Sequence, residues 1–409
     1  WWDCAKACPT LHFPQRELNN EVCEVTIDVR KGGANRAASA GAAVGNATRL
    51  DRNILAVALL AKPTIFVLIF IFAISPARQA SLAPFSSLVQ AAENRPDAEP
   101  ITPETERAIE RGLKWLAAGQ LDDGGFGEGQ YRGNPAVCAL AGMAMISNGS
   151  TPGRGPYGGN VNHVVDYLLG CVRPDGFISG GDAARGPMYG HGFAVTFLAE
   201  CHGMSPRGDL REKLAKAVGI IVASQNDEGG WRYQPVRADA DVSVTACEVM
   251  ALRAARNAGL FVPNETIDRA TRYVKQTQNA DGGFAYMLQG PRESAYPRSA
   301  AAVVALLGAG VYDAPEIERG MKYLSQFPPG KQSKQRETYY YYGQYYAAQA
   351  MWIAGGESWS RWYAAARDEL LARQRQDGAW TSTNGNQYAT AMACIVLQMP
   401  NDYLPIFQR

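Results

Sequence analysis

Apolar residues recur at intervals of three and four residues over most of the chain from residue 101 onward, the spacing that predicts amphipathic helices. Two kinds of helix alternate. One kind mixes charged and apolar residues, as in Thr105–Ala118 and Glu265–Thr277. The other kind is rich in small and apolar residues, and it is predicted over Pro135–Ile146, Gly192–Cys201, Val242–Ala255, Ser299–Gly308, Tyr339–Ile353 and Ala389–Leu397. A polar-faced helix followed by one that is apolar all round indicates an outer and an inner layer.

A short motif lies between the two kinds of helix and returns four times in clear form. Each copy has a Gln six residues before the aromatic of a Gly-containing turn. The copies are Gln120 with Gly124-Gly125-Phe126, Gln225 with Gly229-Gly230-Trp231, Gln278 with Gly282-Gly283-Phe284, and Gln374 with Gly378-Ala379-Trp380. Two weaker copies fill the double-length gaps. One is Tyr167-Leu168 with the turn Asp175-Gly176-Phe177, and the other is Arg319–Leu324, which runs into Pro328-Pro329 without such a turn.

Six helix pairs with a period near fifty residues predict an all-α fold, an α/α toroid. A closed ring is favoured over an open solenoid, because an open solenoid needs a polar cap at each end. Within each copy, we expect the Gln to bond free backbone groups at a helix end and the turn aromatic to bury a large area.

The region before residue 101 has a different character. Residues 1–53 show no clear period and receive no fold; since the first Met is Met143, they are expected to be absent from the mature protein. Thr64–Ile74 is an apolar run that follows Arg52 and Lys62, and its length suits a signal peptide better than a membrane span. We therefore expect a signal peptide over 54–80, with an uncleaved membrane anchor over 54–74 as the alternative, and a linker over 81–100. The remaining part is then exported, to the periplasm or another extracytoplasmic compartment.

The composition narrows the classes of function. The chain has 40 Lys and Arg against 39 Asp and Glu, a balance that argues against nucleic-acid binding and strong attraction to anionic membranes. Eight Cys in 409 residues, without a CxxC pair, do not form a disulfide scaffold, zinc ribbon or redox motif. Walker, Rossmann and HExxH motifs are lacking in the sequence, so no cofactor is expected.

The repeat resembles the QW repeat of squalene-hopene cyclases and related triterpene cyclases, and it is similar to the repeat of prenyltransferase β-subunits. The shared features are a basic residue with Gly or Ala, an aromatic-aliphatic pair, the Gln and the Gly-x-aromatic turn, and they cover residues 101–409. The resemblance implies a terpenoid cyclase/prenyltransferase-like barrel. In that family the Gln and the aromatic tie neighbouring helices together, so the repeat indicates fold more strongly than function.

Asp239-Ala240-Asp241-Val242, directly before a predicted inner helix, resembles the Asp-x-Asp-Asp box of squalene-hopene cyclases. The resemblance implies that Asp241 is the general acid that protonates a terminal alkene, with Asp239 as the first Asp of the box. Val242 stands where the box has its third Asp, and the chain has space for one toroid where full cyclases have two. Such an acid must keep its proton near neutral pH, which burial and a nearby carboxylate favour. The alternatives are that Asp241 only caps the helix and that Asp239 is a surface acid.

A carbocation needs aromatic faces and the exclusion of water. The aromatics near the predicted starts of the inner helices are therefore candidate substrate-binding residues: Tyr131, Tyr189, Trp231, Tyr233, Tyr286, Tyr296, Tyr341, Tyr345 and Tyr388. The alternative is that these rings fill a core. His191 lies where prenyltransferase β-subunits have a zinc-binding His, but no matching Asp-x-Cys is found, so no metal site is expected. His191 is kept as a cavity-lining candidate, with a structural role as the alternative.

Three functions remain open. The first is an exported terpene cyclase-like enzyme that binds a polyprenyl or other apolar small molecule and starts cyclisation with the Asp-x-Asp box. The second is a non-catalytic toroid that binds a lipid, peptide or glycan. The third is a carbohydrate-active toroid, which needs two carboxylates facing each other across the cavity. Membrane association and oligomeric state stay open.

Overall fold

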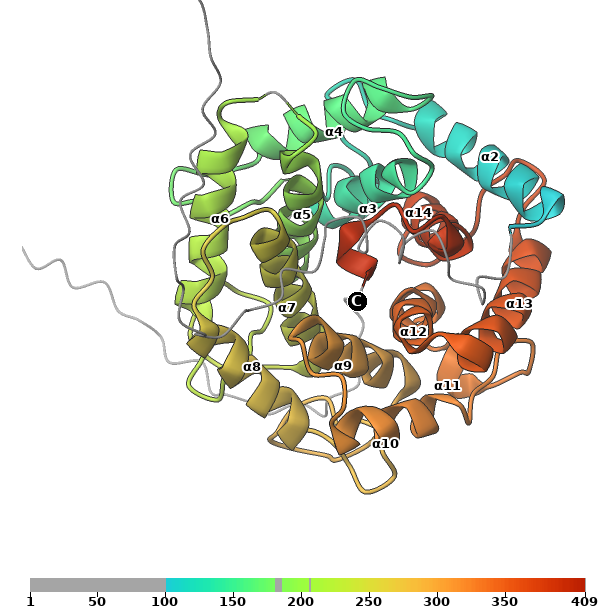
Figure 1. Cartoon of the computed structure of the whole chain (residues 1–409). Helices are drawn as coiled ribbons and strands as arrows, with labels where there is room; N and C mark the ends of the chain where they lie inside the picture. The colour runs from blue at the N-terminus through green and yellow to red at the C-terminus, as the bar shows by residue number, and fades with distance from the viewer. Residues whose placement is uncertain (1–100, 181–185, 206, 409) are drawn as a thin grey trace, which may run out of the picture. The chain divides into compact units, whose positions relative to one another are not determined.

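The computed structural model describes residues 101–180, 186–205 and 207–408, which fold into a ring of helices (Figure 1). These described residues contain thirteen α-helices and isolated β-bridges but no β-strand. The predicted all-α class is therefore confirmed. The predictions for residues 1–53, 54–80 and 81–100 lie outside the described residues.

Six outer helices alternate along the chain with six inner helices, as predicted. The outer helices are α2 (Pro103–Ala118), α4 (Gly158–Gly170), α6 (Leu210–Ser224), α8 (Asn264–Gln276), α10 (Pro315–Leu324) and α13 (Gly356–Arg373). The inner helices are α3 (Pro135–Ile146), α5 (Pro187–His202), α7 (Val242–Asn257), α9 (Tyr296–Gly308), α12 (Tyr340–Ala354) and α14 (Asn386–Leu397). The short elements are α11 (Lys334–Glu337), η2 (Gly129–Tyr131), η3 (Met399–Asn401) and η4 (Pro405–Phe407). None of the described helices combines the length and the apolar character that a membrane crossing requires.

The ring is closed. Each inner helix contacts the next, and α14 contacts both α3 and α2 (Figure 1). At the closure, Gln374 Nε2 donates a hydrogen bond of 2.8 Å to the carbonyl of Ala108 in α2. Gln398 Nε2 donates one of 3.0 Å to the carbonyl of Ala144 in α3. The expected toroid without an open end is confirmed.

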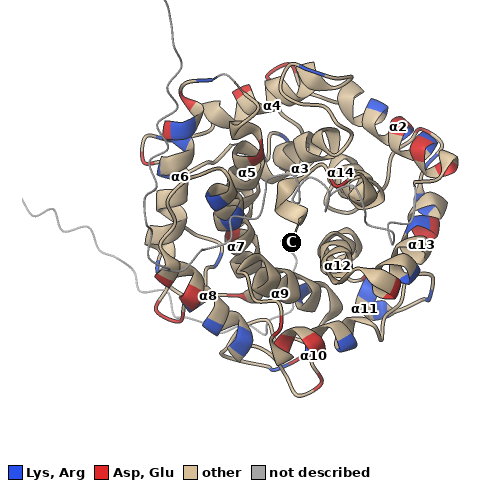
Figure 2. Ribbon diagram, in the orientation of Figure 1, with Lys and Arg blue, Asp and Glu red and all other residues tan. Residues whose placement is uncertain are grey.

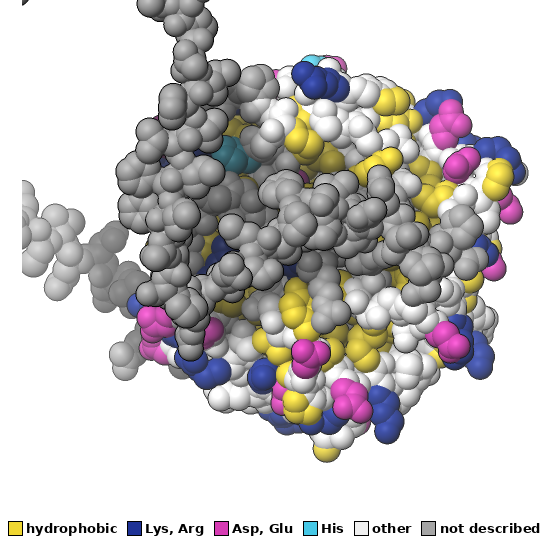
Figure 3. Space-filling model, viewed as in Figure 1, with side chains coloured by type: hydrophobic (Ala, Val, Ile, Leu, Met, Phe, Trp, Pro, Cys, Tyr) yellow, Lys and Arg dark blue, Asp and Glu magenta, His cyan; other side chains and the backbone are white. Residues whose placement is uncertain are grey.

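The two layers differ in chemistry as the sequence pattern predicts. Every residue of α3 is buried, whereas α8 buries a single face that includes Ile267 and Val274. Lys, Arg, Asp and Glu are found mainly on the outer helices and their loops (Figure 2). In the space-filling view, charged side chains are visible along the rim of the molecule (Figure 3). Burial of the inner layer on both sides explains why its sequence is apolar all round.

The repeated Gln joins one helix pair to the next. Its side-chain amide donates one hydrogen bond of 2.8–3.1 Å to a glycine carbonyl of its own turn and another of 2.8–3.1 Å to a carbonyl of the next outer helix. The glycines are Gly124, Gly229, Gly282 and Gly378, and the outer-helix acceptors are Asn160, Thr266, Glu316 and Ala108. The acceptor beyond the turn thus belongs to the following pair, so the Gln fixes the order of pairs around the ring.

The turn aromatics Phe126, Trp231, Phe284 and Trp380 are all buried, as predicted. The backbone N–H of each donates to a side chain of the following inner helix. The acceptors are Cys138 Sγ, Thr245 Oγ1, Ser299 Oγ and Thr390 Oγ1, at 2.9–3.1 Å. These bonds hold each turn on its inner helix.

The weaker copy between α4 and α5 requires a correction. The sequence pattern assigns Phe177 as its turn aromatic, but Ile178 occupies that position. Val172 and Ile178 form the backbone bridge that Gln278 and Phe284 form elsewhere. In this copy Val replaces the Gln, Phe replaces the second Gly and Ile replaces the aromatic, so a search for an aromatic selects the neighbouring residue.

The weaker copy before α12 replaces the turn with a buried cation. Arg336 is 1% exposed and forms an ion pair of 2.6 Å with Glu369 of α13. Its guanidinium also donates to the carbonyls of Pro328 and Lys331, each at 3.3 Å. Arg336 therefore connects the loop after α10 to the outer layer where the other copies use a Gln.

The C-terminal segment enters the middle of the ring. Helix η4 contacts α5, α7 and α12 (Figure 1). Leu404, Ile406 and Phe407 are buried there, and Arg253 near the end of α7 donates to the carbonyl of Gln408. Arg253 lies in the last turns of α7, so the segment is near the C-terminal end of that helix.

Candidate functional site

Asp241 is the N-cap of α7 and is completely buried. Its Oδ1 accepts hydrogen bonds of 2.9 Å from the backbone N–H groups of Ser243 and Val244. Its own N–H donates to the carbonyl of Trp231 at 2.9 Å, which holds the Asp-x-Asp segment against the turn. The capping geometry that the sequence leaves as an alternative is present.

The second oxygen of the same carboxyl has a different environment. Oδ2 of Asp241 is buried and accepts no hydrogen bond of ordinary length from the described residues, although the Tyr286 hydroxyl is close enough to lower the pKa of the carboxyl. The nearest cation is Arg232, whose Nε lies 3.9 Å away. One oxygen therefore caps the helix, while the other faces Arg232 and takes no part in the cap.

Burial raises the pKa of Asp241 to about 6. The N–H of Val244, the charge of Arg232, the N–H of Ser243 and the hydroxyl of Tyr286 oppose this rise, but burial outweighs them. We expected a charge on Asp239 to raise the pKa; instead Asp239 is exposed and pairs with Arg232. The raised pKa thus has desolvation as its cause, which disfavours the charged carboxylate.

Three tyrosines surround this carboxyl and its arginine. The hydroxyls of Tyr233 and Tyr286 are hydrogen-bonded to each other. The Arg232 guanidinium lies 5.2 Å from the ring centre of Tyr233 and 5.9 Å from that of Tyr286. The ring of Tyr189 lies 6.3 Å from that of Tyr233. We call Asp241, Arg232, Tyr189, Tyr233 and Tyr286 the Asp241 cluster.

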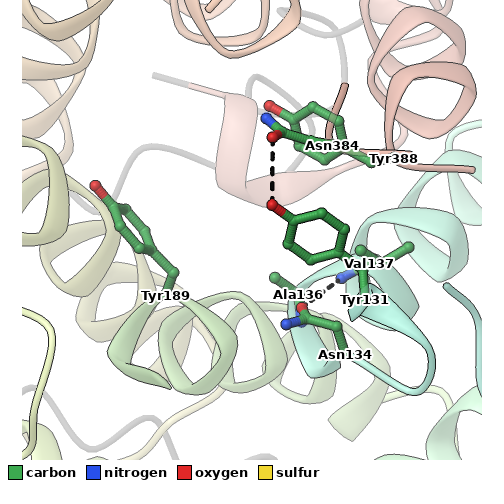
Figure 4. Close-up of a pocket in the computed structure, with 7 residues that line it drawn as sticks. All are labelled: Tyr131, Asn134, Ala136, Val137, Tyr189, Asn384 and Tyr388. Carbon is green, nitrogen blue, oxygen red and sulfur yellow. Dashed lines mark hydrogen bonds between the residues drawn. The ribbon is translucent and has the colours of Figure 1, made fainter. Parts of the chain in front are cut away.

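A small cavity adjoins the cluster at Tyr189. It has a volume of about 20 Å³ and is lined by Tyr131, Asn134, Ala136, Val137, Tyr189, Asn384 and Tyr388 (Figure 4). Tyr189 lies across the opening from Tyr131 and Tyr388, and the Tyr131 hydroxyl donates to Asn384 Oδ1 at 3.4 Å (Figure 4). This space, which we call the Tyr189 cavity, is about the size that one water molecule needs.

A larger cavity of about 290 Å³ lies beside it and includes Tyr341. The two cavities share Asn384 and Tyr388 in their walls. We call the larger one the Ser382 cavity. The structure thus brings Tyr131, Tyr189, Tyr341 and Tyr388 to one end of the ring.

Three of the candidate aromatics lie elsewhere. Trp231 is packed between the layers, where its Nε1 donates to the carbonyl of Ile221 in α6 at 2.7 Å. Tyr296 is buried with its ring 5.7 Å from that of Phe327. Tyr345 is 6.1 Å from the ring of Phe407, next to the C-terminal segment. These three rings fill the core, in agreement with the alternative interpretation.

His191 bonds to the backbone through both ring nitrogens. Nδ1 accepts from the N–H of Ile178 at 3.0 Å, and Nε2 lies 3.0 Å from the carbonyl of Ala217 in α6. Burial lowers its pKa to about 4, so the ring is neutral at physiological pH. His191 thus occupies the position of Thr245 and Ser299 in other copies, and this geometry favours its structural role.

Arg232 and Asn384 are site residues that the sequence analysis does not single out. Arg232 follows Trp231 directly and precedes Asp239 by seven residues, so a basic residue between the turn and the acidic box is the available signal. Asn384 accepts a hydrogen bond from Tyr131, which lies 253 positions earlier in the sequence. No local sequence pattern indicates such a distant contact. In the described part of the chain, no three His, Cys, Asp or Glu side chains are grouped so that they could hold a metal ion.

The sequence is similar to a known family over part of the ring. Residues 200–338 match the squalene-hopene cyclase C-terminal domain. A drimenyl diphosphate synthase from Streptomyces showdoensis is 30% identical over 179 residues, which cover 43% of this chain and 32% of the relative. Another, from Streptantibioticus cattleyicolor, is 31% identical over 186 residues, with the same coverage. The matched region spans about a third of the length of these curated relatives.

Solved structures share the fold. A type II terpene cyclase from Scytonema, in complex with geranylgeranyl dihydroxybenzoate, has a TM-score of 0.50 at 15% identity, covering 76% of this chain and 99% of that one. An inactive α-1,6-mannanase from Salegentibacter, in complex with α-1,6-mannotriose, has a TM-score of 0.54 at 8% identity, covering 73% and 99%. Since both kinds of enzyme have the toroid, the fold by itself does not identify the reaction.

Proposed function

Because the chain resembles the squalene-hopene cyclase superfamily in its sequence and in its toroid, we propose that it is a terpene cyclase-like enzyme. Asp241 protonates the terminal double bond of an isoprenoid chain that enters from the Tyr189 cavity. The observation that carries this proposal is the asymmetry of the Asp241 carboxyl. One oxygen is held by two backbone N–H groups of the helix, and the other is buried, takes no part in the cap and lies 3.9 Å from Arg232 Nε.

The asymmetry supports one position for the acidic proton. Oδ1 already accepts two hydrogen bonds, so the proton of the neutral acid is on Oδ2. In the reaction, that proton forms a C–H bond with the terminal alkene carbon, the π electrons supply the new bond, and a carbocation remains. Arg232 stabilises the Asp241 carboxylate that is left. The final cation then loses a proton to water, and Asp241 takes up a proton again. Substrate and product therefore have the same composition, and the reaction is an isomerisation.

The tyrosines offer the aromatic faces that a developing cation requires. Tyr189 interacts with the charge of Asp241 and lines the Tyr189 cavity together with Tyr131 and Tyr388. At about 20 Å³ the Tyr189 cavity is much smaller than an isoprenoid chain. Substrate binding therefore requires these tyrosine side chains to change rotamer. Before substrate binds, their packed arrangement keeps water away from Asp241.

We also propose that the protein acts outside the cytoplasm. The signal peptide or anchor that we predict over residues 54–80 would carry the toroid out of the cytoplasm. An apolar polyprenyl compound dissolved in a membrane is then the accessible class of substrate.

Binding without turnover is the second candidate function, and Val242 is the observation that favours it. Val242 is buried where the cyclase box has its third Asp, so no carboxylate from that position assists Asp241.

A glycosidase function has less support. It needs a second catalytic carboxylate, and the neighbouring Asp239 is exposed and paired with Arg232.

The test compares the full chain with Asp241→Asn, using squalene and geranylgeraniol as substrates and mass spectrometry of the products. The Asn variant keeps the helix cap but has no acidic proton. We expect cyclised product from the unaltered protein and from the control variant Asp239→Asn, and none from Asp241→Asn. Product from Asp241→Asn refutes the acid role, and absence of product from the unaltered protein supports binding without turnover.

The pH dependence gives a second readout of the same acid. With a pKa of about 6, Asp241 is mostly ionised at pH 8 and mostly protonated at pH 5. The rate of product formation should therefore rise as the pH falls from 8 to 6 and level off below. A rate that falls over this range would contradict the proposal.

A further inference from the structure

The Ser382 cavity lies between the start of α12 and the loop that precedes α14. Its wall includes Tyr339–Tyr341 on one side and Thr381–Asn384 on the other. Because Asn384 and Tyr388 also line the Tyr189 cavity, a ligand that extends past Tyr388 enters the larger space. With about 290 Å³, the Ser382 cavity suits one end of a ligand rather than a complete hydrocarbon chain.

Neutral polar groups dominate its chemistry. The loop supplies the hydroxyls of Thr381, Ser382 and Thr383 and the side-chain amide of Asn384. Thr381 and Thr383 are exposed, and Ser382 Oγ accepts the N–H of Asn384 at 3.2 Å. Hydroxyls and amides both donate and accept, so they suit hydroxyl or carbonyl groups on a ligand.

The charges in the wall compensate each other. Arg373 is the sole cation among the described residues that line the cavity, and its Nη2 lies 2.6 Å from Glu337 and 2.9 Å from Glu369. Its guanidinium is also fixed 3.9 Å from the ring centre of Tyr340. A phosphate group here meets the carboxylate of Glu337 and a guanidinium that already has two anionic partners, so its binding is disfavoured.

The backbone at the edge of this cavity is strained. Tyr339, the residue before α12, has φ of 53°, and among the described residues Asp402 is the other non-glycine residue with a positive φ. A bulky residue in this conformation costs energy and is found more often at functional sites than elsewhere. Tyr339 in this conformation forms part of the wall of the Ser382 cavity.

We propose that the Ser382 cavity binds the uncharged polar head group of an amphipathic isoprenoid and discriminates against a diphosphate. The head group carries hydroxyl or carbonyl oxygens, and its hydrocarbon chain runs past Tyr388 towards Tyr189. The isoprenoid nature of the ligand rests on the proposed function. The preference for a neutral head group rests on the ion pairs and hydroxyls of this cavity.

The test measures binding of geranylgeraniol and geranylgeranyl diphosphate by titration calorimetry, in the full chain with Asp241→Asn so that no turnover occurs. We expect the affinity for the alcohol to be at least about tenfold higher than the affinity for the diphosphate. The reason is that only the diphosphate brings negative charge next to Glu337. Adding Glu337→Gln frees Arg373 from one carboxylate and should strengthen diphosphate binding several-fold while alcohol binding stays the same. Thr381→Val should weaken binding of the alcohol.

The matched control is Glu357→Gln, which removes a carboxylate from the exposed Arg361 pair at the other end of α13. It should leave the ratio of the two affinities unchanged. Equal binding of both probes, no binding of either, or the same ratio in the Glu337 variant overturns the inference. If the alcohol binds selectively but the unaltered protein forms no product, the inference stands and the proposed catalysis fails. If product forms but the two probes bind equally well, the catalysis stands and the inference fails.

Discussion

Asp241 shows how one side chain can serve the fold and the chemistry together. Capping the helix favours the charged carboxylate, and burial favours the neutral acid. The sequence presents these as alternatives, because it shows the position of Asp241 before a helix but not its solvation. In the structure both apply, and burial decides the direction of the pKa shift.

The first prediction is that Asp241→Asn stabilises the protein above pH 6. Folding raises the pKa of Asp241 from 3.8 to about 6, so the native state binds the proton more tightly than the unfolded state does. The stability contribution of Asp241 therefore decreases as the pH rises from 4 to 6. Above pH 6 its buried charge costs about 3 kcal/mol in the free energy of unfolding. Asn caps equally well and is not charged.

Thermal melts of both proteins at several pH values provide the check. The advantage of the Asn variant should be largest above pH 6 and disappear near pH 4. An Asn variant that is less stable at pH 7.5 would show that the carboxylate stabilises the fold, contrary to the direction of the pKa shift.

A second prediction at the residue scale concerns Arg336. Arg336→Ala removes a buried cation from Glu369 and from two carbonyls, and breaking a buried ion pair costs about 3–5 kcal/mol. Urea denaturation should show the loss as a lower midpoint. The control Arg361→Ala removes an arginine from an exposed pair and should leave the midpoint unchanged. Equal midpoints for the two variants would contradict the anchoring role of Arg336.

At the scale of the elements, periodicity predicts the helices well and their first residues less well. Pro135–Ile146 agrees at both ends with α3. The predicted start at Gly192 is five residues late for α5, which begins at Pro187, and Ser299 is three residues late for α9. Proline fits the first turn of a helix, where no N–H partner is needed, so these helices begin before their apolar period becomes visible.

The prediction at this scale compares two glycines of positive φ. Gly229 has φ of 100°, and a Cβ placed there would lie 2.4 Å from the carbonyl oxygen of Arg269 in α8. Gly310 has φ of 86° but has open space around the same position. Gly310→Ala should cost about 1–2 kcal/mol from backbone strain alone. Gly229→Ala should cost clearly more, since it also separates the turn from α8, and equal unfolding free energies would refute this packing.

At the scale of the whole molecule, the repeat predicts the ring, and the sequence selects Asp241 and several tyrosines as candidates without showing which of them meet. The Asp241 cluster combines residues 189, 232–241 and 286, which lie in three helix pairs. The sequence points to Asp241 through its position before α7. Arg232 acquires its role from ion pairs within the same folded segment, and Asn384 acquires its role from contact with Tyr131 of another pair. The sequence also names Tyr296 and Tyr345 as cavity candidates, although their rings pack in the core. A position on an inner helix does not reveal which side of the helix faces the cavity.

Ring closure gives a prediction of its own. Gln374 at the closure makes the same two hydrogen bonds as Gln225 within the ring. Gln374→Ala and Gln225→Ala should therefore lower the free energy of unfolding by similar amounts, about 1–3 kcal/mol for two bonds. In an open array the Gln374 variant would cost little, so a value near zero in a denaturant titration would contradict the closed ring.

The contact between α13 and α2 also determines how the molecule can come apart. A linear solenoid frays from its terminal repeats, because an end repeat has a single neighbour to lose. Here each helix pair has a neighbour on both sides, so opening any pair breaks two interfaces at once. The cost of local opening then approaches that of global unfolding throughout the ring, and the inner helices should exchange their amide hydrogens as one cooperative unit.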